Sequence, residues 1–233
     1  MEKILDALRR LYHTLPRPPS TNYQYRPFTI NPYADLPENG LVLDIGGKAA
    51  RGCYAFGSPP EHCRLICLDI APGPGVDLVA DAHHLEMLPD GSVDCVVAVS
   101  ALEHMEAPWL VVGEIYRVLK PGGLVYINTP FVFPFHGDPD DFYRFSYNGL
   151  SKVCGNFELL ESGFNRGPAS TTTHLLIHFL AILFSFNRKL LYGVWVDLFT
   201  WLLFWLKYLD RFIAHYEQAY VIHSGAFFIG RKP

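Results

Sequence analysis

The chain has 233 residues, enough to bury a full core, and its 19 basic and 23 acidic side chains give a net charge of −4. This balance provides no basic surface of the kind that binds nucleic acid, so we expect no nucleic-acid partner. Half of the residues are hydrophobic and only 18% are charged, which indicates more apolar surface than an ordinary soluble core needs.

The cysteines and the N-terminus favour a cytoplasmic location. Five cysteines form an odd set without a Cys-x-x-Cys pair, which argues against a disulfide scaffold. Residues 1–10 are amphipathic, carry acids and lack the long apolar core of a signal peptide. We therefore expect a protein of the reducing cytosol.

The first 40 residues are expected to form an N-terminal helix and a cap segment. The apolar spacing of residues 3–15 is that of a short helix, and Pro16 ends it. The remainder of residues 1–40 is polar and rich in Tyr and Pro. This segment is expected to wrap the core or to close over a cofactor.

A core predicted over residues 41–165 begins with acids that follow apolar strands. The apolar run 41–45 contains Asp44 and is followed at once by Gly46 and Gly47, as expected for a buried parallel strand breaking into a turn that approaches a ligand closely. A second strand, 64–69, ends in Asp69, and a third, 76–80, precedes Asp81. An acid at such a strand end can accept hydrogen bonds from ribose hydroxyls, so this order points to a nucleoside cofactor.

Strands and helices alternate through the rest of the core. The further predicted elements are a helix over 81–88, a strand over 93–99 ending at Ser100, a helix over 108–119, and strands over 124–129, 157–160 and 226–230. This alternation predicts an α/β fold: a three-layer, Rossmann-like parallel sheet with helices on both faces. Ligands of such sheets bind at the carboxyl ends of the strands.

Several of these segments together resemble the class I S-adenosylmethionine-dependent methyltransferases, and in particular their type-11 group. The resemblance spans about residues 40–165 and the last strand. The segments that carry it are Val42-Leu43-Asp44-Ile45-Gly46, Leu68-Asp69, Val79-Ala80-Asp81-Ala82, Leu88-Pro89-Asp90-Gly91-Ser92-Val93-Asp94, Ser100-Ala101-Leu102-Glu103-His104 and Arg117-Val118-Leu119-Lys120-Pro121-Gly122-Gly123-Leu124.

The resemblance implies S-adenosylmethionine as the cofactor and gives each binding residue a role. The turn would hold the methionine moiety, Asp69 the ribose and Asp81 the adenine amino group, while Ser100 would line the methionine side. Asp44 would either bind as well or only shape the turn through backbone amides. The full implied set is Asp44, Gly46, Gly47, Lys48, Asp69, Ile70, Asp81, Ala82 and Ser100.

The glycine loop departs from the family pattern. Where the family usually reads Gly-x-Gly-x-Gly, this chain has Gly46-Gly47-Lys48-Ala49-Ala50. Lys48 therefore stands at the second glycine position. We expect its side chain either to point outward or to reach the carboxylate of the cofactor.

The loop over residues 129–146 is the predicted acceptor side. It resembles the Pro-x-His-x-x-Pro-x-Asp-Tyr-x-Arg loop of methyltransferases from glycan and lipid biosynthesis clusters. His136 is the first candidate for a general base and His104 the second, since an unperturbed imidazole titrates near working pH. Asp138, or Asp141, would orient His136. Alternatively, His136 and Arg144 pair with the acids and only stiffen the loop.

No metal site is expected from the sequence. His136 and Asp138 could supply two ligands, but no third ligand is fixed by spacing.

Residues 166–224 are predicted to be a hydrophobic helical insertion before a final core strand within 225–233. Two apolar runs, 174–186 and 190–206, flank a polar break. The second run reaches about 25 Å at about 1.5 Å per residue, short of the ~30 Å hydrocarbon core. Asp197 near its centre would cost on the order of 2.5–3.5 kcal/mol in lipid. We therefore expect 174–206 to be a hairpin at the membrane interface; a buried subdomain or a homodimer contact is the alternative.

These observations predict a methyltransferase that acts on a small-molecule, glycan or lipid-linked acceptor, at oxygen. It would be cytoplasmic and peripheral to the inner face of the membrane. Two alternatives stay open: an inactive methyltransferase-like scaffold of a membrane complex, and a nicotinamide-dependent oxidoreductase. The oxidoreductase would need a Gly-x-Gly-x-x-Gly turn, which residues 46–51 lack.

Overall fold

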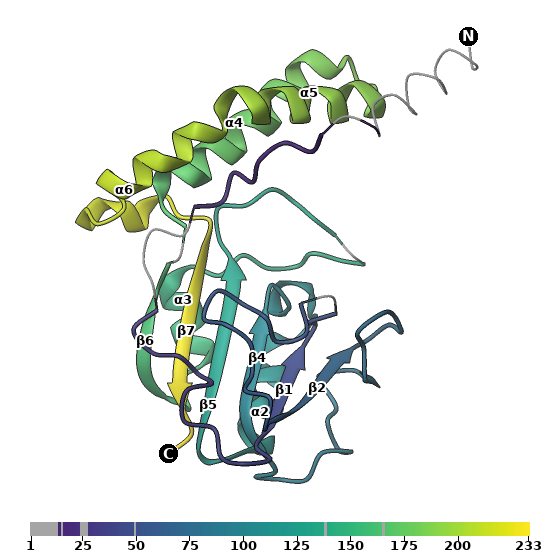
Figure 1. Cartoon of the computed structure of the whole chain (residues 1–233), viewed down its shortest axis with the longest axis vertical. Coiled ribbons are helices and arrows are strands. Elements are labelled where there is room, and N and C mark those ends of the chain that lie inside the picture. Colours follow the sequence, from purple (N-terminus) through teal and green to yellow (C-terminus); the bar gives the residue numbers. More distant parts are fainter. Residues whose placement is uncertain (1–13, 15, 24–27, 49, 138, 165) are drawn as a thin grey trace. The chain divides into compact units, whose positions relative to one another are not determined.

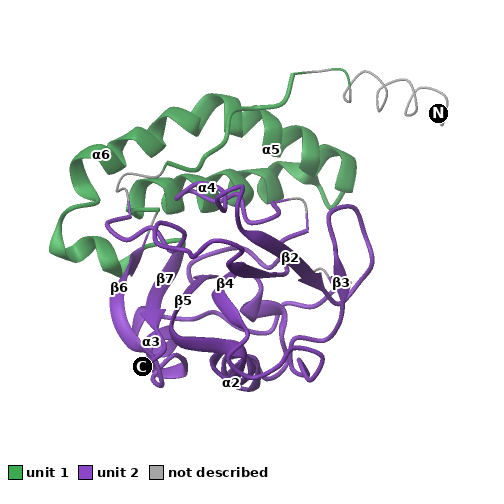
Figure 2. Cartoon of the chain, turned by 60° about the horizontal axis from the view of Figure 1, so that its bottom comes forward, with its two compact units in different colours: residues 1–25, 166–224 green, residues 26–165, 225–233 purple. Residues whose placement is uncertain are grey.

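The computed structural model describes residues 14, 16–23, 28–48, 50–137, 139–164 and 166–233. The chain divides into two compact units (Figure 2): unit 1 comprises residues 1–25 and 166–224, and unit 2 comprises residues 26–165 and 225–233. The helix predicted over residues 3–15 lies outside the described residues, apart from Thr14.

A seven-stranded sheet forms the centre of unit 2 in the described part of the chain. Its order is β3-β2-β1-β4-β5-β7-β6. The strands are β1 (Leu41–Ile45), β2 (Arg64–Asp69), β3 (Leu78–Val79), β4 (Val93–Val99), β5 (Leu119–Pro130), β6 (Glu158–Phe164) and β7 (Gly225–Arg231). The first five run parallel, with Ile45 beside both Leu68 and Ala98. This register brings their carboxyl ends to one edge.

The last strand corrects the prediction of a parallel sheet. β7 inserts between β5 and β6 and runs antiparallel to both, as the opposed arrows of β5 and β7 in Figure 1 show. All of β7 except its last residue is buried, and an apolar run of this kind carries no signal of its direction. The sheet is therefore mixed, while the predicted α/β Rossmann-like class is confirmed.

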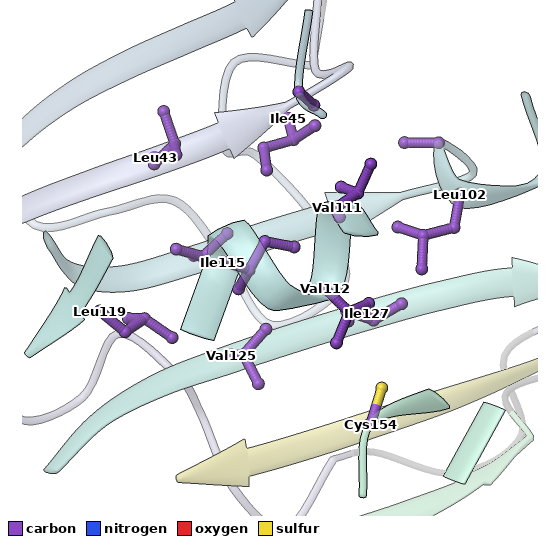
Figure 3. Packing of buried hydrophobic residues seen from close by; sticks show 14 of the residues in the cluster. Leu43, Ile45, Leu102, Val111, Val112, Ile115, Leu119, Val125, Ile127 and Cys154 are labelled. Atoms are coloured by element: carbon purple, nitrogen blue, oxygen red, sulfur yellow. The ribbon is translucent and has the colours of Figure 1, made fainter. Parts of the chain in front are cut away.

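One face of the sheet is covered by α2 (Pro108–Val118) and α3 (Tyr147–Val153). Pro108 occupies the first turn of α2, where no intrahelical donor is needed, and Ser146 caps α3 by accepting a hydrogen bond from the Gly149 amide at 3.2 Å. Val111 and Ile115, one helical turn apart, are fully buried in the same apolar cluster as Leu43 and other strand residues (Figure 3). This packing holds the strands in register beneath the site.

In the described part of unit 2, the opposite face is covered by non-helical chain, although the sequence predicts helices on both faces. The Phe28 ring lies 5.0 Å from that of Phe227, and the Phe56 ring lies 4.8 Å from that of Tyr126. Glu161 of β6 anchors this cover, because its Oε2 accepts from the Thr29 hydroxyl at 2.6 Å. The segment after residue 27 thus packs as an aromatic layer on the sheet.

The helix predicted over residues 81–88 is absent, and turns replace it. The Asp81 carboxylate accepts from the His83 amide at 2.9 Å, which closes a local turn that competes with a helix. The Leu85 amide donates to Glu114 Oε2 of α2 at 2.8 Å. A tertiary contact thus takes the backbone donor that a helix would have used.

Unit 1 contains the predicted hydrophobic helices. They are α4 (Pro168–Ser185), α5 (Lys189–Leu203), η2 (Phe204–Leu209), α6 (Asp210–Ile213) and η3 (Glu217–Val221). The buried Asp210 carboxylate accepts from the Ala169 and Ser170 amides at 2.8 and 2.9 Å and so caps α4. Among the described residues, two helical stretches, Pro168–Ser185 and Lys189–Ile213, are by length and composition able to cross a membrane, and 6% of the apolar 18-residue window of the second is buried.

Candidate functional site

The carboxyl edge of the parallel strands gathers several of the residues singled out in the sequence. Asp44 lies one residue before the end of β1, Asp69 ends β2, and Ser100 directly follows β4. The Gly46 amide donates to the Leu68 carbonyl at 2.7 Å, so the turn after β1 lies against the end of β2. These side chains therefore share one rim, which we call the carboxylate rim (Asp44, Asp69 and Asp81).

Asp44 shapes the turn. Its side chain is fully buried, and its two oxygens accept from the Gly52 amide at 2.6 Å and the Tyr54 hydroxyl at 2.7 Å. Burial raises the pKa of this carboxyl, against the opposing effect of the two hydrogen bonds. Asp44 thus fixes the loop by accepting from it, as the alternative reading of this acid predicted.

The turn after β1 requires glycine at two successive positions. Gly46 has a φ of +76°, a conformation that glycine adopts without a steric penalty. A Cβ atom on Gly47 would lie 1.8 Å from Asp44 Oδ2. Glycine there lets the Asp44 carboxylate pass directly beneath the chain.

Lys48 lies beside the second acid of the rim. Its own φ is +32°, and its ammonium Nζ lies 3.7 Å from Asp69 Oδ1. The Lys48 side chain is about half exposed, whereas that of Asp69 is nearly buried. The lysine that replaces the second glycine of the family loop therefore faces the predicted ribose carboxylate.

Asp69 keeps one carboxylate oxygen available. Its Oδ1 accepts from the Ala71 amide at 3.0 Å, while Oδ2 makes no hydrogen bond among the residues that the structure describes. Ile70, next along the chain, is 64% exposed although it is a large apolar side chain. A buried acid beside an exposed apolar side chain can serve a ligand that is polar at one end and flat and apolar at the other.

Asp81, at the far end of the rim, pairs with its neighbour. Its Oδ1 lies 2.6 Å from His83 Nδ1. Burial acts to raise the pKa of Asp81, but the hydrogen bonds from the His83 amide and imidazole lower it overall. Ala82 is buried, and Ser100 is exposed with a φ of +51°. Asp81 is exposed and can accept a further donor.

A second group of ionisable side chains lies beyond the ends of β4 and β5. It consists of Glu103 and His104, from the short helix η1 (Leu102–His104), and of His136, from the loop after β5. Glu103 Oε1 lies 3.8 Å from His104 Nε2 and 3.6 Å from His136 Nε2. The ligand atoms of the three residues all lie within 4.8 Å of one another. We call this group the histidine–glutamate cluster.

Backbone and side-chain contacts of the β5 loop hold His136 in this cluster. The Glu103 carbonyl accepts from the Phe142 amide at 2.8 Å, which ties η1 to the loop. Asp141 Oδ2 accepts from the His136 amide at 2.8 Å and from Arg144 Nη2 at 2.6 Å. Of the two acids predicted to orient His136, Asp141 therefore does so in the described part of the loop.

The charges around His136 have clear physical causes. Hydrogen bonds from the Arg144 guanidinium hold the pKa of Asp141 well below its usual range, and the same pair raises the pKa of Arg144. Burial raises the pKa of Glu103. Asp141 is therefore a fixed anion, whereas the charge of Glu103 depends on what binds beside it.

The structure brings together most of the residues predicted for the site. Asp138, predicted as a catalytic acid, lies outside the described residues. Glu103 is not among the residues predicted for the site, yet both of its carboxylate oxygens are buried beside two imidazoles. The one available signal was its place directly before His104 and after a predicted strand end.

The rim fits an adenosyl cofactor by the chemistry of its donors. Asp69 offers Oδ2 to a hydroxyl, and Gly46, at the start of the turn, is exposed, whereas Gly47 is buried against Asp44. Ile70 supplies an apolar surface beside the acid. A ribose, its base and an amino-acid tail could thus be bound in order along the rim.

Comparisons with known proteins agree with this fold. A sequence model described as a methyltransferase domain matches residues 43–127. A protein of Mycobacterium sp. (strain JLS), named an uncharacterized methyltransferase, is 32% identical over 110 residues, 43% of each chain. Thiol S-methyltransferase TMT1B of Mus musculus is 29% identical over 107 residues, 38% of this chain and 41% of that protein. The chain thus spans less than half the length of these relatives.

Solved structures share the fold. Phosphoethanolamine N-methyltransferase 2 of Haemonchus contortus, in complex with phosphomonomethylethanolamine and S-adenosylhomocysteine, has a TM-score of 0.52 at 18% identity, over 86% of this chain and 50% of that chain. Coclaurine N-methyltransferase has a TM-score of 0.50 at 12% identity, over 85% and 69% of the two chains. Residues 43–127 thus match a methyltransferase domain, and they lie in a fold shared with solved structures of S-adenosylmethionine-dependent methyltransferases.

Proposed function

We propose that this protein transfers a methyl group from S-adenosylmethionine to a hydroxyl oxygen of a small, glycan-type or lipid-linked acceptor. The observation that carries the proposal is the pairing of two groups at one sheet edge. The carboxylate rim offers donors and acceptors suited to an adenosyl group, and the histidine–glutamate cluster follows β4 and β5 at the same edge.

The rim would bind the cofactor through Asp69 and the Gly46–Gly47 turn, with Asp81 at the adenine end. When bound, S-adenosylmethionine supplies an electrophilic methyl carbon on a sulfonium sulfur. Methyl transfer is an in-line displacement, so the first task of the protein is to position the acceptor oxygen. Lys48, 3.7 Å from Asp69, would either yield that carboxylate to the ribose or bind the carboxylate of the cofactor.

His136 is the residue proposed to take the proton of the acceptor. Its Nε2 faces Glu103 at 3.6 Å, and its amide is held by Asp141. A hydroxyl does not ionise at neutral pH, so its oxygen needs a base to become a good nucleophile. His104, whose ring lies 5.1 Å from that of His136, is the second candidate.

A thiol acceptor is the second candidate function. The observation in its favour is the likeness of residues in this chain to the mouse thiol S-methyltransferase. A thiol with a pKa near 8.5 already supplies some thiolate at neutral pH and depends less on a base. A small-molecule thiol and an alcohol, offered side by side to the wild type and to His136→Ala, distinguish the two. A hydroxyl acceptor should lose most of its turnover in the variant, whereas a thiol should keep most of it.

Calorimetry with S-adenosylhomocysteine tests the cofactor part of the proposal. We expect the wild type to give binding heat, Asp69→Ala to lose it, and the exposed variant Glu86→Ala to keep it. NAD should give no heat, as the match to a methyltransferase domain requires. No heat from S-adenosylhomocysteine with the wild type would favour an inactive scaffold, and an unchanged affinity in Asp69→Ala would show that the ribose site lies elsewhere.

We also propose that the helices of unit 1 lie on a membrane surface and present a lipid-linked acceptor. Large apolar side chains of the second helical stretch are exposed, among them Trp201 at 45%, Trp205 at 54% and Phe212 at 63%. Lys189–Ile213 comprises 25 residues, about 37 Å at about 1.5 Å per residue, so length does not exclude spanning. The acid Asp197 within it favours the interface over the hydrocarbon core.

Flotation of the full chain with anionic vesicles tests this second proposal. The wild type should float, and Trp201→Ser/Trp205→Ser should stay at the bottom while it still binds S-adenosylhomocysteine. If high pH or salt releases the protein, it is peripheral; if only detergent does, it spans. A wild type that stays at the bottom and elutes as a dimer would favour the packing alternative.

A further inference from the structure

Glu103 is a buried acid whose carboxylate oxygens have no hydrogen-bond partner in the described part of the chain. Its side chain is fully buried, and neither carboxylate oxygen accepts a hydrogen bond from any residue that the structure describes. Burying a carboxylate in this way is costly unless a positive charge or donor compensates for it. Glu103 therefore indicates that a positively charged group or a hydrogen-bond donor binds beside it.

The two imidazoles next to Glu103 point their acceptor nitrogens at it. His104 Nδ1 bonds to the Asp140 carbonyl, and His136 Nδ1 bonds to the Pro134 carbonyl at 3.1 Å. A carbonyl only accepts, so Nδ1 of His104 carries the hydrogen. At His136, the Pro134 carbonyl and Asp141 Oδ2, at 3.1 and 3.3 Å, are closer to Nδ1 than the donor Arg144 Nη2 at 3.5 Å, so they favour the same tautomer. In a neutral imidazole of this tautomer, Nε2 carries a lone pair. The Nε2 atoms of both histidines face the Glu103 carboxylate.

Three electron-pair donors, the Glu103 carboxylate and the two Nε2 atoms, thus face one another. A protonated imidazole bonded to Glu103 would bring Nε2 to about 2.7–2.9 Å from the carboxylate, but the separations are 3.6 and 3.8 Å. Ligand atoms around a tetrahedral ion, at about 2.0–2.1 Å from it, stand about 3.3 Å apart. The two Glu103–imidazole distances are close to those of a metal site and wide for a hydrogen bond, and all three ligand atoms lie within 4.8 Å of one another.

The surroundings are also those of a metal site. Metal-bound histidines commonly donate their other ring nitrogen to a carbonyl or carboxylate, which fixes the tautomer. Both histidines do so here, and Asp141 Oδ2 lies 3.3 Å from His136 Nδ1 as well. Two imidazoles and one carboxylate suit zinc and the neighbouring divalent transition metals better than magnesium or calcium, which prefer oxygen donors.

We propose that Glu103, His104 and His136 bind one divalent transition-metal ion. Three protein ligands leave a coordination position free, as in catalytic zinc sites. This step of the inference rests on the proposed function: the free position would take the hydroxyl oxygen of the acceptor and lower its pKa. The hydroxyl proton then leaves to solvent, because His136 Nε2 holds the metal instead.

In the transfer itself, the metal-bound oxygen forms the new bond to the methyl carbon as the carbon–sulfur bond breaks. The bonding electron pair stays on sulfur, which leaves a neutral thioether. His136 thereby changes role from base to ligand. The sequence prediction of no metal site rested on His136 and Asp138 alone, whereas the proposed site joins His136 to Glu103 and His104.

Titration of the chelator-treated full chain with Co²⁺, read by its visible absorption, tests the metal site. A Cys53→Ser/Cys63→Ser background removes the two cysteines with exposed or partly exposed thiols. We expect one equivalent of cobalt to bind with nitrogen and oxygen ligands, and Zn²⁺ to displace it. Glu103→Gln and His136→Gln should each weaken binding at least tenfold, while His84→Gln, on an exposed histidine, should not.

Calorimetry with S-adenosylhomocysteine on the same proteins separates this proposal from the proposed function. Glu103→Gln should lose cobalt and keep S-adenosylhomocysteine, whereas Asp69→Ala should show the reverse. Less than 0.2 equivalent of bound cobalt, or binding equal in Glu103→Gln, His136→Gln and the parent, overturns the metal site. That outcome leaves the cofactor site to be judged by its own titration, and circular dichroism shows that each variant is folded.

Discussion

Asp44 and Glu103 are both fully buried carboxylates near the same edge of the sheet, yet their surroundings differ completely. Asp44 accepts from the Gly52 amide and the Tyr54 hydroxyl, so the protein satisfies it. Glu103 has no hydrogen bond among the described residues and faces two histidine nitrogens. A satisfied buried acid serves the fold, whereas an unsatisfied one is kept for a ligand.

The same contrast distinguishes the carboxylate rim from the histidine–glutamate cluster. The rim is preformed by the protein, because its loops are tied to Asp44 and its turn needs glycine at Gly47. The cluster is held from outside, through Asp141 and backbone carbonyls, while its centre is left unpaired. Stability should therefore respond in opposite directions when each acid is neutralised.

The largest effect is expected at Asp44. Asp44→Ala leaves the Gly52 amide and the Tyr54 hydroxyl without their acceptor and should lower the free energy of unfolding by about 3 kcal/mol. Asp44→Asn keeps one acceptor oxygen and should cost about 1 kcal/mol. Urea unfolding measures both. Equal midpoints for the two variants would show that Asp44 does not hold the loop.

Gly47→Ala is expected to act through the same carboxylate. The new Cβ would lie 1.8 Å from Asp44 Oδ2 and must displace it, at a cost of about 2 kcal/mol. Gly73→Ala is the control, because a Cβ there meets nothing within 4 Å. The double variant Asp44→Ala/Gly47→Ala should lose clearly less than the two single losses added together. Strict additivity would mean that the turn fails for another reason.

Neutralising Glu103 should increase the stability of the metal-free protein, whereas the changes at Asp44 and Gly47 should decrease it. In chelator, Glu103→Gln removes a buried carboxyl whose oxygens have no hydrogen-bond partner and should raise the free energy of unfolding by about 1–2 kcal/mol. Exposed Glu106→Gln should leave it unchanged within about 0.5 kcal/mol. Thermal unfolding with and without Zn²⁺ measures the difference. If metal-free Glu103→Gln is less stable than the wild type, Glu103 makes stabilising contacts within the protein, as Asp44 does, and the contrast is wrong.

The sequence alone predicts the rim well and the cluster poorly, for a physical reason. Asp44 and Asp69 follow apolar runs, and parallel strands must align their ends, so local pattern is enough to bring these acids to one edge. Glu103 and His136 are distant in sequence and meet only because β4 and β5 are neighbours and the loop folds back. No spacing rule could supply a third metal ligand from that distance.

Two other differences between the predicted and the observed fold also come from contacts between distant segments. Residues 81–88 have helical spacing, but the Leu85 amide is taken by Glu114 of α2. β7 is apolar throughout, and nothing in such a run indicates that it enters the sheet antiparallel between β5 and β6. In each case a contact between distant segments decides what local sequence leaves open.

The smallest effect is expected at Glu114, an acid satisfied like Asp44 but partly exposed. Hydrogen bonds from Arg117 lower the pKa of Glu114, so its contribution is present above the unfolded value near 4.5 and is lost as the pH falls through the lower folded value. Glu114→Gln should therefore cost about 1 kcal/mol at pH 7, and the difference from the wild type should shrink toward pH 3. Exposed Glu86→Gln should show no such trend in urea midpoints measured across this range. If the stability difference between Glu114→Gln and the wild type stays constant down to pH 3, the interaction depends on hydrogen-bond geometry and not on the charge of Glu114.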